Sequence, residues 1–377
     1  MEKKWHSVLA LVVVTGLLLS ACAAPKSPAP APAPAPSSAA ATPAAPKPGA
    51  TREQQLIEAI KAAGEKEVVF WTLSWYSGPV EQAFEAKYPF LKLKAVDMSA
   101  ELEPRLVEEY KAGRYNPDVV MVPLYRAVRL QSAGILQEYP FPNWPNTWPG
   151  QPKHNFWRNT QDSLRLPMYN TDRVAPADVP KSWQDLDNAK WRGRSIISTS
   201  AGSWIIGYAY ELGDLTKEGA KWDRTVSFWK KVVETTRPRV GTGFKGPLDL
   251  VVVGDVDIML VSAATTGLYN IRRGAPVDFA PLKTTTADPW SVALPKFPPH
   301  PNAAQLLIDF LTSEEGVIAA DIFPNPTRHP NMMKKAIANQ YYAGKGTQII
   351  YVPDELAPEA MYPEADNIWI RDVIGRR

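Results

Sequence analysis

Residues 67–71 read EVVFW, residues 91–96 read LKLKAV and residues 118–122 read DVVMV, and these three short segments decide the fold. The first and third are near-continuous apolar runs, whereas the second alternates apolar and polar residues. Continuous runs of this length are typical of strands buried on both faces, and alternation is typical of a strand buried on one face. The sequence therefore predicts three strands within the first 75 residues of the body.

The segments between these strands carry apolar residues at helical spacing. One helix is predicted to begin at Ser77, a second to cover residues 101–112 and end at Gly113, and a third to cover residues 125–133. Strands that alternate with helices in this order usually form a mainly parallel sheet with helices on both faces.

A second strand–helix series follows a segment rich in Pro, Trp and Asn, residues 139–157, which is expected to be an irregular surface loop. The stripe formed by Trp222, Val226, Trp229 and Val233 has helical spacing and indicates a buried helix face. The other elements expected in this series are an extended segment at 164–169, strands at 195–198 and 257–261, and helices at 202–212, 268–273 and 304–311.

The amino-acid composition excludes several classes of protein function. Of 377 residues, 45% are hydrophobic and 21% are charged, so the chain can bury a sizeable core and is not a disordered acidic chain. The net charge of +3 comes entirely from the first 50 residues, which hold four lysines and one acidic residue. A neutral body argues against a nucleic-acid partner, and a single cysteine excludes a disulfide framework or a multi-cysteine metal site.

The N-terminus has the pattern of an export signal. Lys3 and Lys4 precede a short apolar run, Val8 to Leu19, which is too short to span a bilayer but suits a signal-peptide core. Residues 19–22 read LSAC, which resembles the lipobox of bacterial lipoproteins. The resemblance implies a signal peptide at 1–21, a lipid on Cys22 and an exported chain anchored to the outer face of the cell membrane or in the periplasm. A conventional cleaved signal with an incidental cysteine is the alternative.

Residues 23–50 form a compositionally distinct segment with nine prolines and twelve alanines. Such a segment favours an extended polyproline-like spacer, which at ~3.1 Å per residue reaches on the order of 80 Å. The sequence thus predicts a globular body held near a membrane through its N-terminal lipid.

Three groups of motifs resemble the extracellular solute-binding proteins of ABC importers, in the branch that contains the ferric-iron-binding proteins. The likeness covers residues 66 to 330 approximately. The motifs are Tyr169-Asn170-Thr171-Asp172 with 180–186 and 190–194; Gly254-Asp255-Val256-Asp257-Ile258 with 272–277; and 303–311 with Ser313-Glu314-Glu315-Gly316.

This resemblance implies an α/β, two-lobed fold whose ligand lies in a cleft between the lobes, and a monomer that delivers a small solute to an ABC-transporter permease. The two strand–helix series agree with such a division. We expect the chain to cross between lobes at Leu164–Tyr169 and again near Asp278–Lys283. Lobe one would then take residues 51–160 and 284–377, and lobe two residues 161–283.

The sequence departs from the iron-binding branch where its members carry adjacent tyrosine ligands. The matching stretch here is residues 264–270, in which Thr265 and Thr266 replace phenolates and Tyr269 is offset by about three residues. Ferric iron prefers anionic oxygen ligands, and threonine hydroxyls are poor substitutes. An organic anion or an anionic metal chelate is therefore the favoured ligand, direct ferric-iron binding is the alternative, and no resident metal or cofactor is expected.

Candidate ligand-binding residues cluster at three predicted strand-to-helix turns, where backbone N–H groups and helix dipoles favour an anion. Ordinary helix capping is the competing explanation for the Ser and Thr residues. Aromatic residues near these turns offer stacking surfaces, with Trp75 and Trp204 expected to be exposed and Trp71 buried, and Arg126 offers a partner for a carboxylate or phosphonate. The full set is Thr72, Ser74, Trp75, Tyr76, Tyr125, Arg126, Ser200, Gly202, Ser203, Trp204, Thr265, Thr266, Tyr269 and Trp290.

An enzyme, in particular a secreted lipid-anchored hydrolase, is the main alternative from another class. The body contains only His154, His300 and His329, all in segments that predict surface loops, and it lacks the nucleophile-elbow, metalloprotease and phosphate-loop motifs. A binding protein without catalytic residues is therefore favoured. A structural or adhesive lipoprotein would need no closing cleft and is the third possibility.

Overall fold

The structure of the chain is a computed structural model. The residues that it describes are 50–72, 77–98, 101–144, 151–200, 204–320, 327, 329, 331, 342–352, 356 and 360–375. The predicted signal peptide, the lipidation residue Cys22 and all but the last residue of the predicted spacer lie outside the described residues. Among the helices of the described segments, none combines the length and the apolar composition needed to cross a bilayer.

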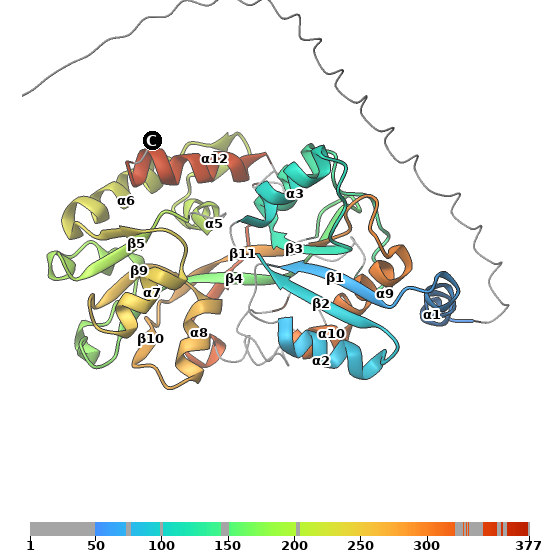
Figure 1. Cartoon of the computed structure of the whole chain (residues 1–377). Coiled ribbons are helices and arrows are strands. Elements are labelled where there is room, and N and C mark those ends of the chain that lie inside the picture. The colour runs from blue at the N-terminus through green and yellow to red at the C-terminus, as the bar shows by residue number, and fades with distance from the viewer. Residues whose placement is uncertain are drawn as a thin grey trace, which may run out of the picture. The chain divides into compact units, whose positions relative to one another are not determined.

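The first half of the body is built on a parallel three-stranded sheet in the order β2-β1-β3 (Figure 1). Glu67 of β1 pairs with Lys92 of β2, and Phe70 of β1 pairs with Val119 of β3. The strands are β1 (Glu67–Thr72), β2 (Lys92–Asp97) and β3 (Val119–Pro123), and the helices that follow them are α2 (Ser77–Lys87), α3 (Leu102–Lys111) and α4 (Leu124–Ser132). Each element predicted for this half is confirmed to within two residues at either end.

The second half repeats this arrangement with a parallel sheet in the order β9-β5-β8. Its strands are β5 (Ser195–Ser198), β8 (Arg239–Gly241) and β9 (Ile258–Ala263), and its helices are α5 (Trp204–Glu211), α6 (Asp223–Thr236), α7 (Lys245–Val252) and α8 (Ala264–Arg272). Its smaller elements are β6 (Leu215–Thr216), β7 (Gly219–Ala220) and three 3-10 turns, Pro176–Asp178, Trp183–Leu186 and Ala189–Trp191. The predicted mainly parallel sheets are confirmed.

Two long antiparallel strands, β4 (Trp157–Asn170) and β11 (Thr284–Ala293), connect the halves. β11 pairs with β3 and β4 pairs with β9, so one sheet runs through the body in the order β2-β1-β3-β11-β4-β9-β5-β8. β4 includes Leu164–Tyr169, the segment at which the sequence predicts the first crossing. The second predicted crossing, Asp278–Lys283, overlaps the end of β10 (Val277–Phe279), which pairs with β4, and stops one residue before β11 begins. The lobe boundaries given above stay a prediction.

Four further helices complete the described part of the body. They are α1 (Arg52–Ala63), α9 (Pro301–Leu311), α10 (Glu314–Ala320) and α12 (Met361–Asn367), which continues as a π-helical segment, Ile368–Val373. A short strand, β12 (Gln348–Ile350), runs parallel to the start of β11.

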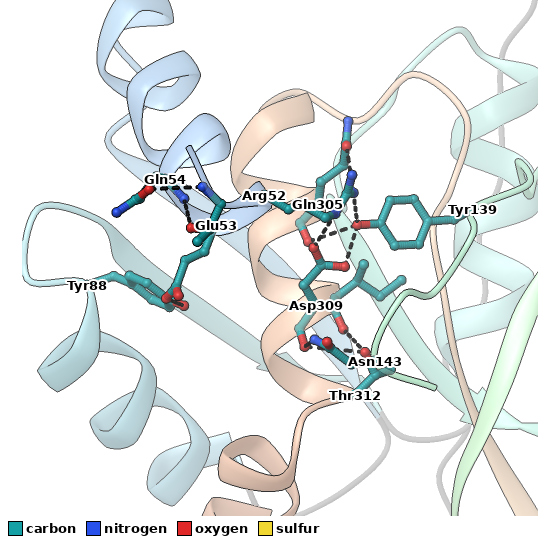
Figure 2. Close-up of polar contacts among 11 residues, drawn as sticks. Arg52, Glu53, Gln54, Tyr88, Tyr139, Asn143, Gln305, Asp309 and Thr312 are labelled. Atoms are coloured by element: carbon teal, nitrogen blue, oxygen red, sulfur yellow. Dashed lines mark hydrogen bonds and ion pairs between the residues drawn. The ribbon is translucent and has the colours of Figure 1, made fainter. Parts of the chain in front are cut away.

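A polar network fixes α1, the helix that follows the predicted spacer, to α9 (Figure 2). Arg52 Nε donates to Asp309 Oδ2 at 2.8 Å, and Tyr139 OH donates to Asp309 Oδ1 at 2.5 Å. Burial raises the pKa of Asp309, and these two donors oppose that rise by stabilising the carboxylate. Thr51 and Gln54 form a capping box at the start of α1. The helix is thereby held by specific side chains as well as by its apolar face.

The second half has an aromatic core in which Trp204, Trp229 and Trp369 lie within 5.5 Å of one another, measured between ring centroids. The expectation that Trp204 is exposed is wrong, because its side chain is fully buried and stacks on Trp183 with 6.0 Å between centroids. α5 places this residue on the face that packs against α6, which no local pattern reveals. Trp71 is buried, as predicted.

One of the three body histidines, His329, differs from the surface position expected for it. His329 is buried, with its ring 4.9 Å from that of Trp144. His300 precedes α9 and is 24% exposed, and its Nδ1 lies 2.8 Å from the buried carboxylate of Asp118. Both side chains therefore serve the packing of the first half.

Candidate functional site

The connecting strands β4 and β11 carry an unusual number of buried polar side chains where the two halves meet. Buried strands at the centre of a sheet are normally apolar, so a polar strip of this kind needs an explanation. The buried polar residues on these strands are Arg158, Asn159, Thr160, Gln161, Asp162, Ser163, Arg165, Asn170, Thr285, Thr286, Asp288 and Ser291.

Arg165 and Asp288 form an ion pair at the centre of this strip. Arg165 Nη2 lies 2.6 Å from Asp288 Oδ2, and the side chains are 5% and 1% exposed. The guanidinium carbon lies 4.7 Å from the centroid of the Phe244 ring, which precedes α7. Burial lowers the pKa of Arg165, and the nearby Asp288 carboxylate opposes that shift.

One N–H group of the Arg165 guanidinium is not used in a hydrogen bond with the described residues. Its Nη1 donates to Ser163 Oγ, but its Nε is buried and has no hydrogen-bond partner among the residues that the structure describes. A buried donor without a partner costs about 1–3 kcal/mol, more when charged, so an oxygen-bearing ligand at this point would be favoured. Sequence reasoning missed Arg165, although a charged residue inside the segment LRLPM was a detectable signal.

Two predicted ligand-binding residues, Tyr125 and Arg126, lie at the start of α4. Arg126 Nε donates to Tyr125 OH at 2.9 Å and lies 3.7 Å from Glu103 of α3. Burial raises the pKa of Tyr125; the nearby Arg126 opposes the rise, whereas the charge of Asp288 adds to it. The structure therefore brings one of these first-half residues, Tyr125, close enough to interact electrostatically with Arg165 and Asp288.

From the second half, the loop ends of β5 and β8 approach the same region. Ser200 N donates to Ser198 Oγ at 2.9 Å, and Gly243 N donates to Ser200 Oγ at 3.1 Å. The hydroxyl of Ser200, a predicted ligand contact, thus holds the loop that presents Phe244 to Arg165.

A cavity of about 280 Å³ lies between α7 and α8 in the second half. It is lined by Lys245, Asp249, Thr266, Tyr269, Asn270 and Arg273. Lys245 Nζ lies 2.9 Å from Asp249 Oδ2, and Arg273 donates to the hydroxyl of Tyr269 and stacks over its ring at 5.2 Å. The structure therefore brings the predicted residues Thr266 and Tyr269 together, with one more cationic than anionic side chain around them.

The other predicted site residues divide into two groups. Thr72 is buried at the end of β1, Trp290 is 7% exposed on β11, and Trp204 belongs to the aromatic core rather than to an open surface. The backbones of Ser74, Trp75, Tyr76, Gly202 and Ser203, and the side chain of Thr265, lie outside what the structure describes. Within the described segments, no group of three or more His, Cys, Asp or Glu side chains is arranged to hold a metal ion.

Comparison with known proteins places these features in a family. Residues 81–327 match the model of the bacterial extracellular solute-binding protein family. A curated relative from Sinorhizobium fredii, a probable ABC transporter periplasmic-binding protein, is 33% identical over 127 residues, which are 32% of this chain and 33% of that protein. The chain therefore aligns with about a third of the length of this relative.

Solved structures resemble the chain over most of its length. A substrate-binding protein of an Agrobacterium tumefaciens ABC transporter gives a TM-score of 0.66 at 16% identity, covering 82% of this chain and 96% of that one. The binding protein MotA of A. tumefaciens, in complex with glucopine, gives 0.63 at 14% identity, covering 81% and 99%. The apo ferric ion-binding protein A of Pasteurella haemolytica gives 0.62 at 16% identity, covering 83% and 99%.

At these identities the likeness shows the fold, and it confirms the predicted α/β, two-lobed binding-protein architecture. The predicted resemblance to solute-binding proteins is confirmed by the family match, which includes the crossing strands and the cavity residues described above. The chain belongs to the family of bacterial extracellular solute-binding proteins.

Proposed function

We propose that this protein captures a small organic anion outside the cytoplasm and delivers it, unaltered, to the permease of an ABC-type importer. The observation that carries the proposal is Arg165, a buried guanidinium on a connecting strand whose Nε lacks a partner among the described residues. A carboxylate or phosphonate oxygen would satisfy this donor, and charged hydrogen bonds of this kind are among the strongest in proteins.

The cavity beside α7 and α8 supports the same ligand class. Its lining includes Arg273 and Lys245, the hydroxyl of Thr266 and the ring of Tyr269, which together suit an anionic molecule with a polar organic body. The curated relative is named as a probable ABC transporter periplasmic-binding protein, and the ligand named with MotA is glucopine, an organic molecule.

Direct ferric-iron binding is the second candidate, since ferric ion-binding protein A shares the fold. Thr265 and Thr266 stand where the iron-binding branch carries tyrosines, and hydroxyls are weaker ligands than phenolates for a hard cation. These residue types therefore favour the organic anion over bare iron.

The export signal and spacer complete the proposal. A lipid on Cys22 would anchor the chain to the outer face of the cell membrane or in the periplasm, and the Pro/Ala-rich segment would let the body reach a permease nearby. α1, fixed to the body through Arg52 and Asp309, would be the point at which the spacer attaches. Release of ester-linked fatty acid on alkaline hydrolysis of the membrane-purified chain, and its absence in a Cys22→Ser variant, would test the anchor.

The ligand class is tested by mass spectrometry of whatever copurifies with the full chain, followed by calorimetric titration with citrate, gluconate, 2-aminoethylphosphonate and ferric chloride alone. We expect one or more of the organic anions to bind and ferric chloride not to bind. Binding of ferric ion alone would overturn the proposal in favour of the iron-binding alternative.

Arg165→Lys is expected to weaken binding of such an anion at least tenfold, because lysine keeps the charge opposite Asp288 but removes the Nε donor. Arg158→Lys is the matched control: Arg158 is buried on the same strand but donates to the backbone oxygens of Trp144, His154 and Trp157. Calorimetry gives the affinities and circular dichroism checks the fold. Equal loss of affinity in both variants would remove Arg165 from the site.

Arg273→Ala is expected to weaken binding of the same anion by about 10-fold or more, because a charged hydrogen bond contributes about 1.5–3 kcal/mol. Arg272→Ala is its control, since Arg272 is exposed on the same helix and does not line the cavity. Unchanged affinity in Arg273→Ala would place the ligand elsewhere.

A further inference from the structure

The C-terminal helix, α12 with its π-helical continuation, contacts both halves of the body although it lies outside the family-matched residues 81–327. The helix packs against α5 and α6 of the second half and against α4 of the first. Figure 1 shows it in red above α5 and α6, with its N-terminal end directed towards α3. The helix therefore lies where elements of both halves meet.

Trp369 anchors the helix in the second half. Its side chain is 1% exposed, and its Nε1 donates to the carbonyl of Ser198 at 3.0 Å. Its ring lies 5.1 Å from that of Trp204 and 5.5 Å from that of Trp229. Trp222 Nε1 adds a bond of 3.1 Å to Glu364. A helix held by a buried tryptophan in this way should move together with α5 and α6.

Asp366 makes the contact with the first half. Its Oδ2 lies 3.8 Å from Arg129 Nη2 of α4, and its side chain is only 13% exposed. Arg129 and Arg126 also approach Glu103 of α3, at 3.6 and 3.7 Å. Asp366 is thus buried by the meeting of elements from opposite halves.

We propose that the C-terminal helix acts as a latch between the halves. In the closed form it buries Asp366 against α4, and a lower pH shifts the equilibrium towards that closed form. The proposal rests on the proposed function, because it requires that the halves move about β4 and β11 as a ligand is captured and released. Since Trp369 ties the helix to the second half, opening would separate Asp366 from α4 and expose its carboxyl to water.

The charged groups around Asp366 determine whether the pKa of its carboxyl rises or falls when the halves close. It faces Arg129, Arg126 and the hydroxyl-bearing Tyr125 from α4, and Glu103 from α3. From α5, Glu211 is directed to a hydrogen bond with Thr284 instead.

Burial raises the pKa of Asp366 to about 6, and Arg129 and Arg126 only partly oppose it, so burial outweighs the long ion pair. An exposed aspartate would have its ordinary value, so the latched form binds the proton more tightly than the open form. Latching is therefore fully favoured below the open-form pKa and is progressively weakened as pH rises through about 6. Between pH 7.5 and pH 5 the closing equilibrium should change about tenfold.

The test measures the distance between the halves by pulsed electron paramagnetic resonance on the full chain. Nitroxide labels are placed at Glu108→Cys and Lys231→Cys, which are 70% and 69% exposed, with the single native cysteine removed by Cys22→Ser. We expect the ratio of short-distance to long-distance population to rise about tenfold in the otherwise unchanged chain from pH 7.5 to pH 5. Asp366→Asn should show the short-distance population at both pH values, because a neutral amide has no charge to bury.

Glu364→Gln is the matched control, since Glu364 lies on the same helix but bonds Trp222 rather than α4; it should keep the pH response. An Asp366→Asn variant that keeps the full pH response, or a chain whose distances do not change with pH, would overturn the latch. If the chain binds an organic anion but the distances do not change with pH, only the latch is overturned. If the distances change with pH but no organic anion binds, only the proposed ligand is overturned.

Discussion

Asp288→Ala is expected to lower the free energy of unfolding by about 3–5 kcal/mol, which is one of the two largest effects that the structure implies for a single substitution. The carboxylate of Asp288 lies 2.6 Å from Arg165, and both side chains are buried. Removing one member of such a pair leaves a charge without compensation in a low-dielectric interior. Urea titration followed by circular dichroism measures the change.

The double variant Arg165→Met with Asp288→Leu distinguishes this mechanism from simple loss of packing. Apolar side chains of similar size need no compensating charge, so the double variant should be much more stable than Asp288→Ala and within about 1–2 kcal/mol of the unchanged chain. It should also fail to bind the organic anion. A double variant as unstable as Asp288→Ala would show that the pair is not the source of the effect.

Trp229→Ala is expected to cost about 3–5 kcal/mol, because a large cavity would open in the aromatic core of the second half. The ring of Trp229 is fully buried and lies 5.3 Å from Trp204 and 5.5 Å from Trp369. Since Trp369 belongs to the C-terminal helix, the same substitution should also loosen that helix. Hydrogen exchange over residues 360–375 measures the second effect, and urea titration the first.

Val226→Ala is the control for this variant, because Val226 lies three residues earlier in α6 and is only partly buried. It should cost about 1 kcal/mol or less. Similar losses in both variants would contradict the aromatic core as the main support of the second half.

The strands and helices of the first half, and β5, α5 and β9 of the second, could be predicted because their signals are local, whereas β8 and α7 were not predicted. β1, β3 and β9 are largely apolar runs, and the stripe of Trp222, Val226, Trp229 and Val233 has helical spacing, although Trp222 precedes α6 and both valines are only partly buried. Such patterns arise from the burial of one segment against its neighbours and are visible in a window of a few residues. The family motifs, which recur at known spacing, extended this local information to the two-lobed architecture.

The candidate site was predicted only in part. Thr266 and Tyr269 were placed near the ligand by motif position, and the structure shows them lining one cavity. Arg165 was missed and Trp204 was wrongly expected to be exposed, because the burial of either residue depends on segments more than a hundred positions away or on a neighbouring helix. Periodicity describes the faces of an element but does not say what covers them.

The sequence by itself determined the class of this protein: a chain with alternating strands and helices and the motifs of solute-binding proteins. Only the tertiary structure decided which polar residues meet. Arg165 and Asp288 become partners because β4 and β11 pair antiparallel between the halves, and Asp366 reaches Arg129 because Trp369 is inserted among the aromatic rings of the second half. Residues this far apart along the chain do not interact until the chain has folded, so their contacts cannot be read from local sequence patterns.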